Sequence, residues 1–238
     1  IKGDLIHSGG ALNVNGGTLI VEGDYRIQTP TESDPAYTYS RGILTMTNAL
    51  DKVLVQGNFV TDSNQNHSSY LTAGELEVRG NFSQRSTNTS SNTPRYNFSA
   101  SGTHRVVLSG TAQQTVSFDD PYASYSRFNV LSLQNVSING VVFSSALAVI
   151  TLEGNAYVLN PLTVSTMTWS LSEDVSVSGI LNLSGSTLDL NGKTLTIKGD
   201  LIHSGGALNV NGGTLIVEGD YRIQTPTESD PAYTYSRG

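Results

Sequence analysis

The chain contains an exact internal repeat, and this repeat constrains its fold more than any other feature of the sequence. Residues 1–42 and residues 197–238 are identical, so the 238 residues hold only 196 independent positions. An exact repeat is typical of a tandem array in which each unit packs against its neighbours. We therefore expect one continuous domain over residues 1–238, in which residues 1–196 form one full repeat unit and residues 197–238 begin the next.

A shorter period runs inside the 196-residue unit. The pattern apolar–x–apolar–x–Gly recurs with Gly-to-Gly spacings of 34, 23, 30, 44, 25, 20 and 20 residues, which together make 196. The longest spacing contains a related pattern from Leu131 to Asn135, and Asn is the residue that best replaces Gly where φ is positive. Taking Asn135 as the missing marker predicts eight turns, and we expect each Gly or Asn marker to end a strand with left-handed backbone.

The alternation between the markers predicts the fold class. Apolar residues two positions apart lie on one face of a β-strand, and the residue between them lies on the other face. Short alternating segments separated by Gly-containing turns, at 19–25 residues per unit, are typical of solenoid rungs. The predicted fold is all-β: a right-handed parallel β-helix (β-solenoid) with about eight rungs per 196-residue unit and protruding loops. Right-handedness follows from the usual hand of parallel crossover connections.

The same alternation predicts which side chains form the core. We expect continuous aliphatic columns inside the solenoid, with Tyr25, Phe59 and Phe82 stacked after the turns. The residue directly before each marker is polar, which predicts a solvent-exposed column. The predicted inward residues are Leu12, Val14, Leu19, Val21, Leu44, Met46, Val53, Val55, Leu76, Val78, Val106, Leu108, Leu131, Leu133, Ile150, Leu152, Val175, Val177, Leu195 and Ile197. The predicted polar column is Glu22, Gln56, Arg79, Ser109, Gln134, Glu153, Ser178 and Lys198.

Composition excludes several classes of function. The chain has no cysteine, so disulfides and thiol chemistry are excluded, and its 13 Lys and Arg residues form no basic run, which argues against nucleic acid binding. The longest apolar stretches are far shorter than the ~20 residues of a membrane span. No metal-binding His spacing, nucleophile elbow, phosphate loop or dinucleotide fingerprint is present. We therefore expect a protein that is not an enzyme, with no catalytic, cofactor-binding or metal-ligating residues.

Two groups of acidic residues are the weak candidates for catalysis. Asp119 and Asp120 lie near Arg127 in the sequence, and Glu173 is adjacent to Asp174. Polysaccharide lyases and hydrolases need paired carboxylates, or Asp clusters beside a basic residue. Adjacent residues on a strand point in opposite directions, which argues against either group.

Asp residues that follow the markers form the one metal hypothesis. Asp4 would stack beneath Asp24, and Asp200 beneath Asp220, one rung apart. Two close carboxylates repel each other unless a cation or a proton intervenes, and Ca²⁺ takes oxygen ligands. A weak Ca²⁺ site is one interpretation. The other is that these side chains cap turns by accepting hydrogen bonds from backbone amides.

The repeat style of residues 9–24, GGALNVNGGTLIVEGD, is similar to that of repetitive β-helical surface proteins of bacteria. These include filamentous-haemagglutinin-like adhesins and giant extracellular repeat proteins. The resemblance implies an extracellular or cell-surface location and a structural or adhesive role, and it implies no catalytic residue.

Three functions remain open from the sequence. The favoured one is a structural repeat module of a long extracellular filament or surface fibre, whose partners are copies of itself, joined as covalent tandem repeats or end to end. The alternative is an adhesin or carbohydrate-binding module that contacts cell-surface glycans through aromatic loops. The third is a polysaccharide lyase or hydrolase. The loop aromatics are Tyr37, Tyr39, Tyr70, Tyr96, Phe98, Tyr122 and Tyr125.

Overall fold

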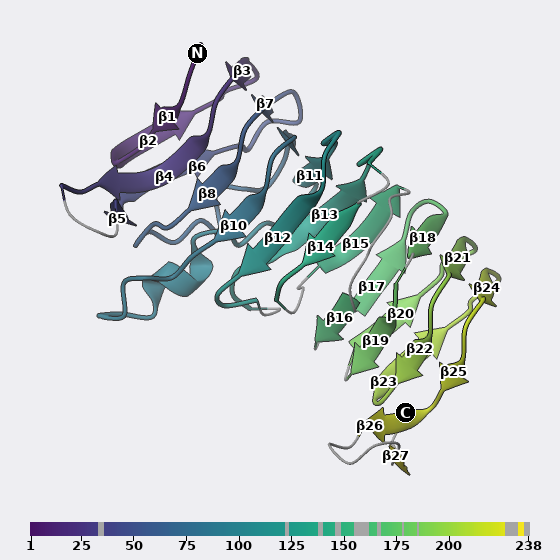
Figure 1. The fold of residues 1–238 in the computed structure, drawn as a ribbon. Helices are drawn as coiled ribbons and strands as arrows, with labels where there is room; N and C mark the ends of the chain where they lie inside the picture. Colours follow the sequence, from purple (N-terminus) through teal and green to yellow (C-terminus); the bar gives the residue numbers. More distant parts are fainter. Residues whose placement is uncertain are drawn as a thin grey trace.

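The computed structural model describes residues 1–32, 36–121, 124–137, 140–145, 149–154, 162–165, 168–177, 179–184, 186–226 and 233–235. The fold is all-β, and most neighbouring strands are parallel (Figure 1). The helical element of these residues is the short 3-10 turn η1 (Thr93–Tyr96). None of the described segments is a helix of the length and apolarity that crossing a bilayer requires.

The strands form a few parallel sheets and two hairpins. The first sheet contains, in order of pairing, β1 (Leu5–Ile6), β4 (Tyr25–Pro30), β8 (Phe59–Thr61), β10 (Phe82–Gln84), β12 (Gln114–Phe118) and β14 (Val141–Phe143). The nine-stranded sheet contains β3 (Thr18–Val21), β7 (Lys52–Val55), β9 (Glu75–Val78), β11 (Arg105–Leu108), β13 (Phe128–Leu133), β15 (Val149–Gly154), β17 (Thr168–Leu171), β20 (Ser186–Asp189) and β23 (Gly206–Asn209).

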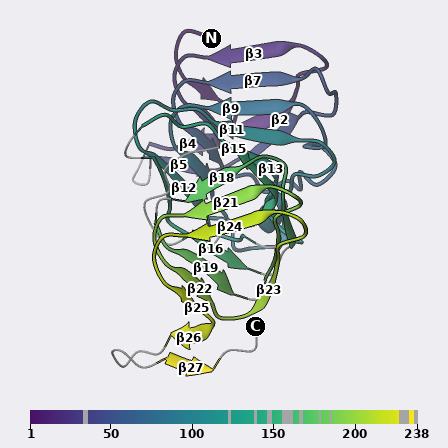
Figure 2. The same ribbon diagram turned by 90° about the vertical axis from the view of Figure 1, so that its right-hand side faces the viewer.

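The remaining strands lie mainly toward the C-terminal end (Figure 2). A four-stranded sheet contains β16 (Leu162–Ser165), β19 (Leu181–Ser184), β22 (Leu201–His203) and β25 (Tyr221–Arg222). A three-stranded sheet contains β18 (Val175–Val177), β21 (Thr194–Ile197) and β24 (Thr214–Val217), and β2 (Gly9–Asn13) pairs with β6 (Arg41–Thr45). In the antiparallel hairpins β4 pairs with β5 (Tyr37–Tyr39), and β26 (Gln224–Pro226) pairs with β27 (Tyr233–Tyr235).

Neighbouring strands of the parallel sheets come from successive segments of the chain. In the nine-stranded sheet the spacing between paired residues ranges from 19, between Thr151 and Ser170, to 34, between Thr18 and Lys52. We call the strands of one such segment a layer. Each layer pairs with the one before it and the one after it, so the arrangement confirms the prediction of stacked parallel strands and is compatible with a β-solenoid.

The Gly markers are needed for a reason different from the one we predicted. The φ angles of Gly23, Gly57 and Gly80 do not lie in the positive region. A Cβ atom on Gly80 would lie 2.5 Å from the carbonyl carbon and oxygen of Gly57, and one on Gly57 would lie 2.6 Å from the carbonyl carbon of Gly23. At Gly57 and Gly80 successive layers approach so closely that only glycine fits. The positive φ angles of non-glycine residues occur instead in Asn-Gly turns, at Asn15, Asn191 and Asn211.

The predicted column of markers holds as far as β13, is wrong for β15 and β17, and holds again from Val175 through Leu195 to Leu215. Leu131 lies opposite Val106, which confirms the register that Asn135 indicated. Leu131 then lies opposite Leu152 rather than Ile150, and Leu152 lies opposite Leu171 rather than Val177. Strand β17 carries the same apolar alternation without a Gly marker and takes the place that we assigned to β18. At this point of the stack the spacing of apolar pairs, and not the Gly marker, matches the observed strand pairing.

This change of column places the two copies of the repeated segment in different sheets. Strand β3 is at one end of the nine-stranded sheet, whereas its identical copy β24 belongs to the three-stranded sheet. The column of paired residues that starts at Thr18 reaches Asn209 after eight steps, five residues before Thr214, the copy of Thr18. The prediction that eight turns restore the register is therefore wrong for this sheet.

The core agrees with the predicted inward positions. The predicted residues from Val21 onward are buried, while Leu12, Val14 and Leu19 are half-buried and pack against the core. The side chain of Ile150 lies outside the described residues. The rings of Tyr25 and Phe59, and those of Phe59 and Phe82, have centroids 5.4 Å apart, which confirms the aromatic stack. Phe98 lies in the turn after η1 but is buried and joins this stack at 4.8 Å from Phe82, so it is not part of an exposed aromatic surface.

The predicted polar column is exposed at most of its described positions, with one exception. Glu22, Gln56, Arg79, Gln134 and Lys198 are exposed and Ser109 is half-buried, whereas Ser178 lies outside the described residues. Glu153 is buried, because it forms an ion pair with Arg105 and accepts a hydrogen bond from the Ser172 hydroxyl at 2.8 Å. A charged side chain is buried here only with its partners in place.

Candidate functional site

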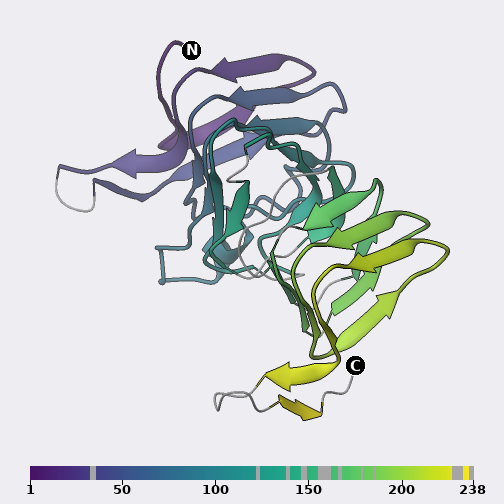
Figure 3. The same ribbon diagram turned by 45° about the vertical axis from the view of Figure 1, so that its right-hand side comes forward.

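The two copies of the repeated segment have the same side chains, but a following layer covers only the first copy. Residues 1–42 are covered by the layer that begins near residue 43, and residues 197–226 occupy the opposite end of the stack (Figure 3). Tyr25 is 0% exposed and its copy Tyr221 is 44% exposed. Ile27 is 1% exposed and its copy Ile223 is 54% exposed. The difference measures what one added layer covers.

On the opposite face of the repeated segment the second copy is the more buried one, because a preceding layer covers it. Leu201 is fully buried beneath the preceding layer, whereas its copy Leu5 is only half-buried. Ile197 is fully buried and its copy Ile1 is exposed. Within the described residues, both ends of the stack therefore present apolar side chains together with unpaired strand edges, which are the groups that pair with further strands.

For the strands of the repeated segment, each edge that is unpaired at one end of the stack is paired in the other copy. The free edges of β23, β24 and β25 correspond to the edges of β2, β3 and β4 that pair with β6, β7 and β8. At the opposite end, the free edges of β1, β2 and β3 correspond to the edges of β22, β23 and β24 that pair with β19, β20 and β21. The chain thus shows both neighbours of the repeated layer, one in each copy.

A ladder of side-chain hydrogen bonds runs between the layers. The Oδ1 atom of Asp4 accepts the N–H of Asp24 at 2.8 Å, and Oδ1 of Asp24 accepts the N–H of Asn58 at 2.8 Å. Asn58 accepts the N–H of Asn81 at 2.8 Å, which in turn accepts the N–H of Thr115 at 2.7 Å. The predicted caps are correct in their chemistry, but they join one layer to the next instead of closing their own turns.

The stacked carboxylates are bound by a guanidinium group and by amides, which take the role that a bound cation would have. Oδ2 of Asp24 lies 2.6 Å from a guanidinium nitrogen of Arg26, and Asp220 pairs with Arg222 in the same way. Within the described residues no three His, Asp or Glu side chains converge as a metal site would require. The carboxylate pair of Asp4 and Asp24 is therefore held by amides and a guanidinium group.

The histidines lie inside the stack rather than at a reactive centre. Nε2 of His7 lies 3.0 Å from the Gly10 carbonyl oxygen, so Nε2 carries the proton and Nδ1 accepts from the Tyr25 hydroxyl at 3.0 Å. His67 and His104 are fully buried, and burial lowers the pKa of each to about 4 because the charged ring would lose its water. In the described structure neither ring nitrogen of His104 has a hydrogen-bond partner.

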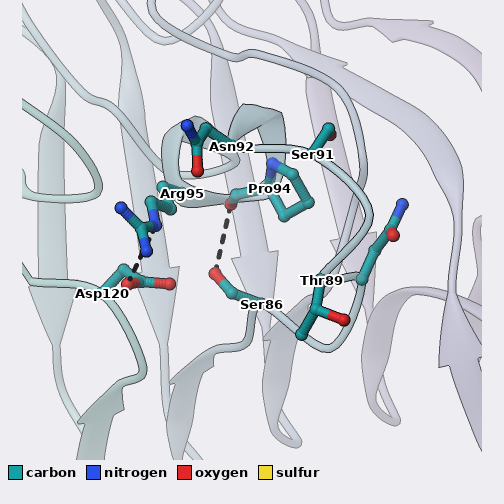
Figure 4. Close-up of a pocket in the computed structure, with 8 residues that line it drawn as sticks. Ser86, Thr89, Ser91, Asn92, Pro94, Arg95 and Asp120 are labelled. Carbon is teal, nitrogen blue, oxygen red and sulfur yellow. Dashed lines mark hydrogen bonds and ion pairs between the residues drawn. The ribbon is translucent and has the colours of Figure 1, made fainter.

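A polar pocket lies under the loop that carries η1 (Figure 4). Nε of Arg95 lies 3.5 Å from Oδ1 of Asp120, and the Arg95 guanidinium lies over the Tyr125 ring at 5.5 Å. Tyr96 packs edge-on against Tyr125 at 5.2 Å. The pocket is lined by Ser86, Asn88, Thr89, Ser91, Asn92, Pro94, Arg95 and Asp120. No pattern in the sequence indicates it, because it joins residues 86–95 to Asp120 of a later loop.

The other loop aromatics lie at separate places. Tyr37 contacts Arg26, whose guanidinium carbon lies 4.9 Å from the ring centroid, within the hairpin of β4 and β5. Tyr39 and Tyr70 are exposed, and Tyr122 lies outside the described residues. Of the predicted loop aromatics that the structure describes, Tyr96 and Tyr125 lie next to the pocket.

The carboxylates that were candidates for catalysis have structural partners. Asp119 accepts the Ser86 N–H at 2.9 Å, and Asp174 accepts the Thr194 N–H at 2.7 Å. Asp120 pairs with Arg95, and Nε of Arg127 donates to the Ala100 carbonyl at 3.0 Å.

Comparison with known proteins adds no relative. No protein-family model, no curated protein and no solved structure matches the chain. The two strand-edge surfaces and the loop pocket are therefore the features from which a function is inferred.

Proposed function

We propose that the chain is a structural repeat module of a long extracellular β-solenoid filament or surface fibre, folded as a right-handed parallel β-helix. The observation that carries this proposal is the pair of strand-edge surfaces. The edges of β23, β24 and β25 have the sequence of edges that are covered by β6, β7 and β8. A chain that continued after residue 238 with the sequence that follows residue 42 would meet a matching edge.

The mechanical role follows from what each layer covers. Tyr221 and Ile223 are 44% and 54% exposed without a following layer, and their copies are almost fully buried with one. Burial of this apolar surface contributes about 25 cal/mol per Å², so each added layer stabilises the one before it by several kcal/mol. Stability then accumulates along one axis, as a fibre requires. We place the fibre outside the cell because its repeat style is similar to that of bacterial surface proteins.

Covalent concatemers test the filament proposal. Proteins with one, two and three 196-residue units should form rods whose length grows by ~38 Å per unit, from eight layers at about 4.8 Å each. Electron microscopy of negatively stained particles measures this length. Compact particles whose longest dimension does not grow with the number of units would overturn the proposal.

A second candidate function is glycan binding, and the loop pocket favours it. Asp120 and Arg95 offer an acceptor and donors to neighbouring sugar hydroxyls, with Tyr125 beside them. The net charge of −7 and the carboxylate in the pocket favour a neutral sugar over an acidic one. Asp120→Asn should weaken binding to a neutral glycan array, while Arg79→Ala, at an exposed position just after β9, should not. No binding by the unsubstituted chain would exclude this function.

A further inference from the structure

We propose that residues 197–238 of one molecule exchange with residues 1–42 of another, so that a second copy of this chain is the binding partner of the strand-edge surface. The exchange rests on the proposed filament function, because it uses the same stacking of layers. In the exchanged state the C-terminal copy of one molecule lies beside residues 43–61 of the next, and the N-terminal copy of that next molecule is displaced.

The incoming segment can form every interaction that the displaced segment forms. Residues 1–42 pair with residues 41–61 through β2 with β6, β3 with β7 and β4 with β8. The Asp24 carboxylate accepts hydrogen bonds from the backbone and side-chain amides of Asn58 at 2.8 and 3.0 Å. Asp220 is the copy of Asp24, and every other group on this edge also recurs in residues 197–238. The interactions that break beside residues 43–61 are therefore chemically identical to those that replace them.

The C-terminal copy already has the conformation that the exchange needs. Its hairpin pairs Gln224 with Tyr235, as the N-terminal hairpin pairs Gln28 with Tyr39. His203 lies 3.3 Å from the Tyr221 hydroxyl, as His7 lies 3.0 Å from that of Tyr25. A segment that is preorganised for its partner loses little conformational entropy on binding.

The balance of burial makes the exchange depend on concentration. The incoming layer is covered on both faces in the exchanged state, because β20 and β21 of its own molecule pair with the opposite edges of β23 and β24. In the described structure the displaced layer is covered on one face only, and Ile1 is exposed on it whereas its copy Ile197 is buried. Exchange thus buries Tyr221 and Ile223 and releases residues 1–42, which were covered on one face only. Because each exchange joins two molecules, higher protein concentration favours it.

The two edges are different, so exchange does not stop at a dimer. The C-terminal copy of each molecule inserts into the next molecule, whose own C-terminal copy stays available. Such a contact between two unlike surfaces forms open chains unless it closes into a ring. The expected products are therefore head-to-tail series of molecules.

Introduced cysteines test the exchange in the full chain, which contains no cysteine of its own. Thr18 lies opposite Lys52 on neighbouring strands, and Thr214 is the copy of Thr18. In one molecule β7 and β24 belong to different sheets near opposite ends of the stack (Figure 1). A disulfide in the Lys52→Cys/Thr214→Cys variant therefore joins two molecules, and aligned positions on adjacent strands satisfy disulfide geometry.

The expected result is a ladder of disulfide-linked species with two, three and more chain masses on non-reducing gels, and its share rises with protein concentration. Thr18→Cys/Lys52→Cys is the matched control, because its disulfide closes within one molecule and fixes residues 1–42 in place. This control should remain monomeric until it is reduced. The single variants Lys52→Cys and Thr214→Cys should give no species larger than a dimer.

One result would contradict the exchange and leave the filament proposal unaffected. If Thr18→Cys/Lys52→Cys closes its internal disulfide while Lys52→Cys/Thr214→Cys stays monomeric at every concentration, the geometry is suitable and the exchange does not occur. Rods from covalent concatemers would still support the filament. Compact concatemers would instead overturn the filament and, because the exchange uses the same stacking of layers, the exchange as well.

Discussion

Two tyrosines at equivalent positions of the repeat allow the stabilisation contributed by one covering layer to be measured within one molecule. Tyr25 and Tyr221 have the same sequence neighbours, and each contacts a histidine through its hydroxyl. They differ in the layer that follows, because Tyr25 is 0% and Tyr221 44% exposed. Tyr25→Ala should therefore destabilise its layer more than Tyr221→Ala does.

The expected difference follows from the area that the next layer covers. A tyrosine buries roughly 200 Å², so 44% of it is about 90 Å², which contributes about 2 kcal/mol at 25 cal/mol per Å². The edge-to-face contact with Phe59 at 5.4 Å adds about 1 kcal/mol. Tyr25→Ala should thus cost about 3 kcal/mol more than Tyr221→Ala, which corresponds to about 100-fold in a local opening equilibrium.

Native-state hydrogen exchange with mass spectrometry measures this difference. A substituted peptide differs in mass from its unsubstituted copy, so both layers are followed separately in one sample. The amide of Leu5, which donates to the Asp24 carbonyl, reports the first layer, and the amide of Leu201, which donates to the Asp220 carbonyl, reports the last. Exchange near residue 5 in Tyr25→Ala should accelerate about 100-fold more than exchange near residue 201 in Tyr221→Ala.

A second pair of substitutions supplies the control. Leu201 is buried by the preceding layer and Leu5 is half-buried, so Leu201→Ala should cost more than Leu5→Ala. The N-terminal substitution should thus be the more destabilising one in the tyrosine pair, and the C-terminal substitution in the leucine pair. If the N-terminal copy were the more sensitive in both pairs, or if the two tyrosine variants were equal, coverage by neighbouring layers would not be the source of stability.

Three further predictions concern single sites. Gly80→Ala should lower the melting temperature by several degrees, because its Cβ would lie 2.5 Å from backbone atoms, whereas Gly9→Ala, with nothing within 4 Å, should leave it unchanged. Burial lowers the pKa of His104 from 6.5 to about 4, so the unfolded chain takes up the proton first and stability falls by about 3 kcal/mol between pH 6.5 and 4. In urea titrations at the two pH values, His104→Leu should remove the loss due to His104, leave the similar loss due to His67, and raise stability at pH 7. Adding millimolar Ca²⁺ should not shift the melting temperature, since Asp24 already has amide and guanidinium partners; a rise of several degrees would restore the metal hypothesis.

The sequence predicts the buried side of each strand well and the pairing of strands between layers less well. Alternation determines which side of a strand is apolar, so Val53, Leu76 and Val106 are buried as predicted. The choice of partner strand depends on which apolar pair is nearest along the stack. Trp169 and Leu171 lack a Gly marker, so the marker pattern missed β17 although its alternation is present in the sequence.

Features that join distant layers were the hardest to predict. The tight approach at Gly57 depends on where Gly23 lies, and a local pattern indicates only the conformational freedom of glycine. Asp4 was recognised as a capping residue, but its acceptor role is directed to Asp24 in the next layer. Likewise, Arg95 meets Asp120 only because two loops leave the stack on the same side.

The side-chain ladder gives the stack a direction. In each described step from Asp4 to Thr115 the acceptor belongs to the earlier layer and the backbone N–H donor to the later one. Asp200 and Asp220 repeat that sense. The later end therefore presents a carboxylate and the earlier end presents backbone amides. Two like ends brought together would oppose either two anions or two sets of donors, so a filament of the proposed kind would be a polar polymer with chemically distinct ends.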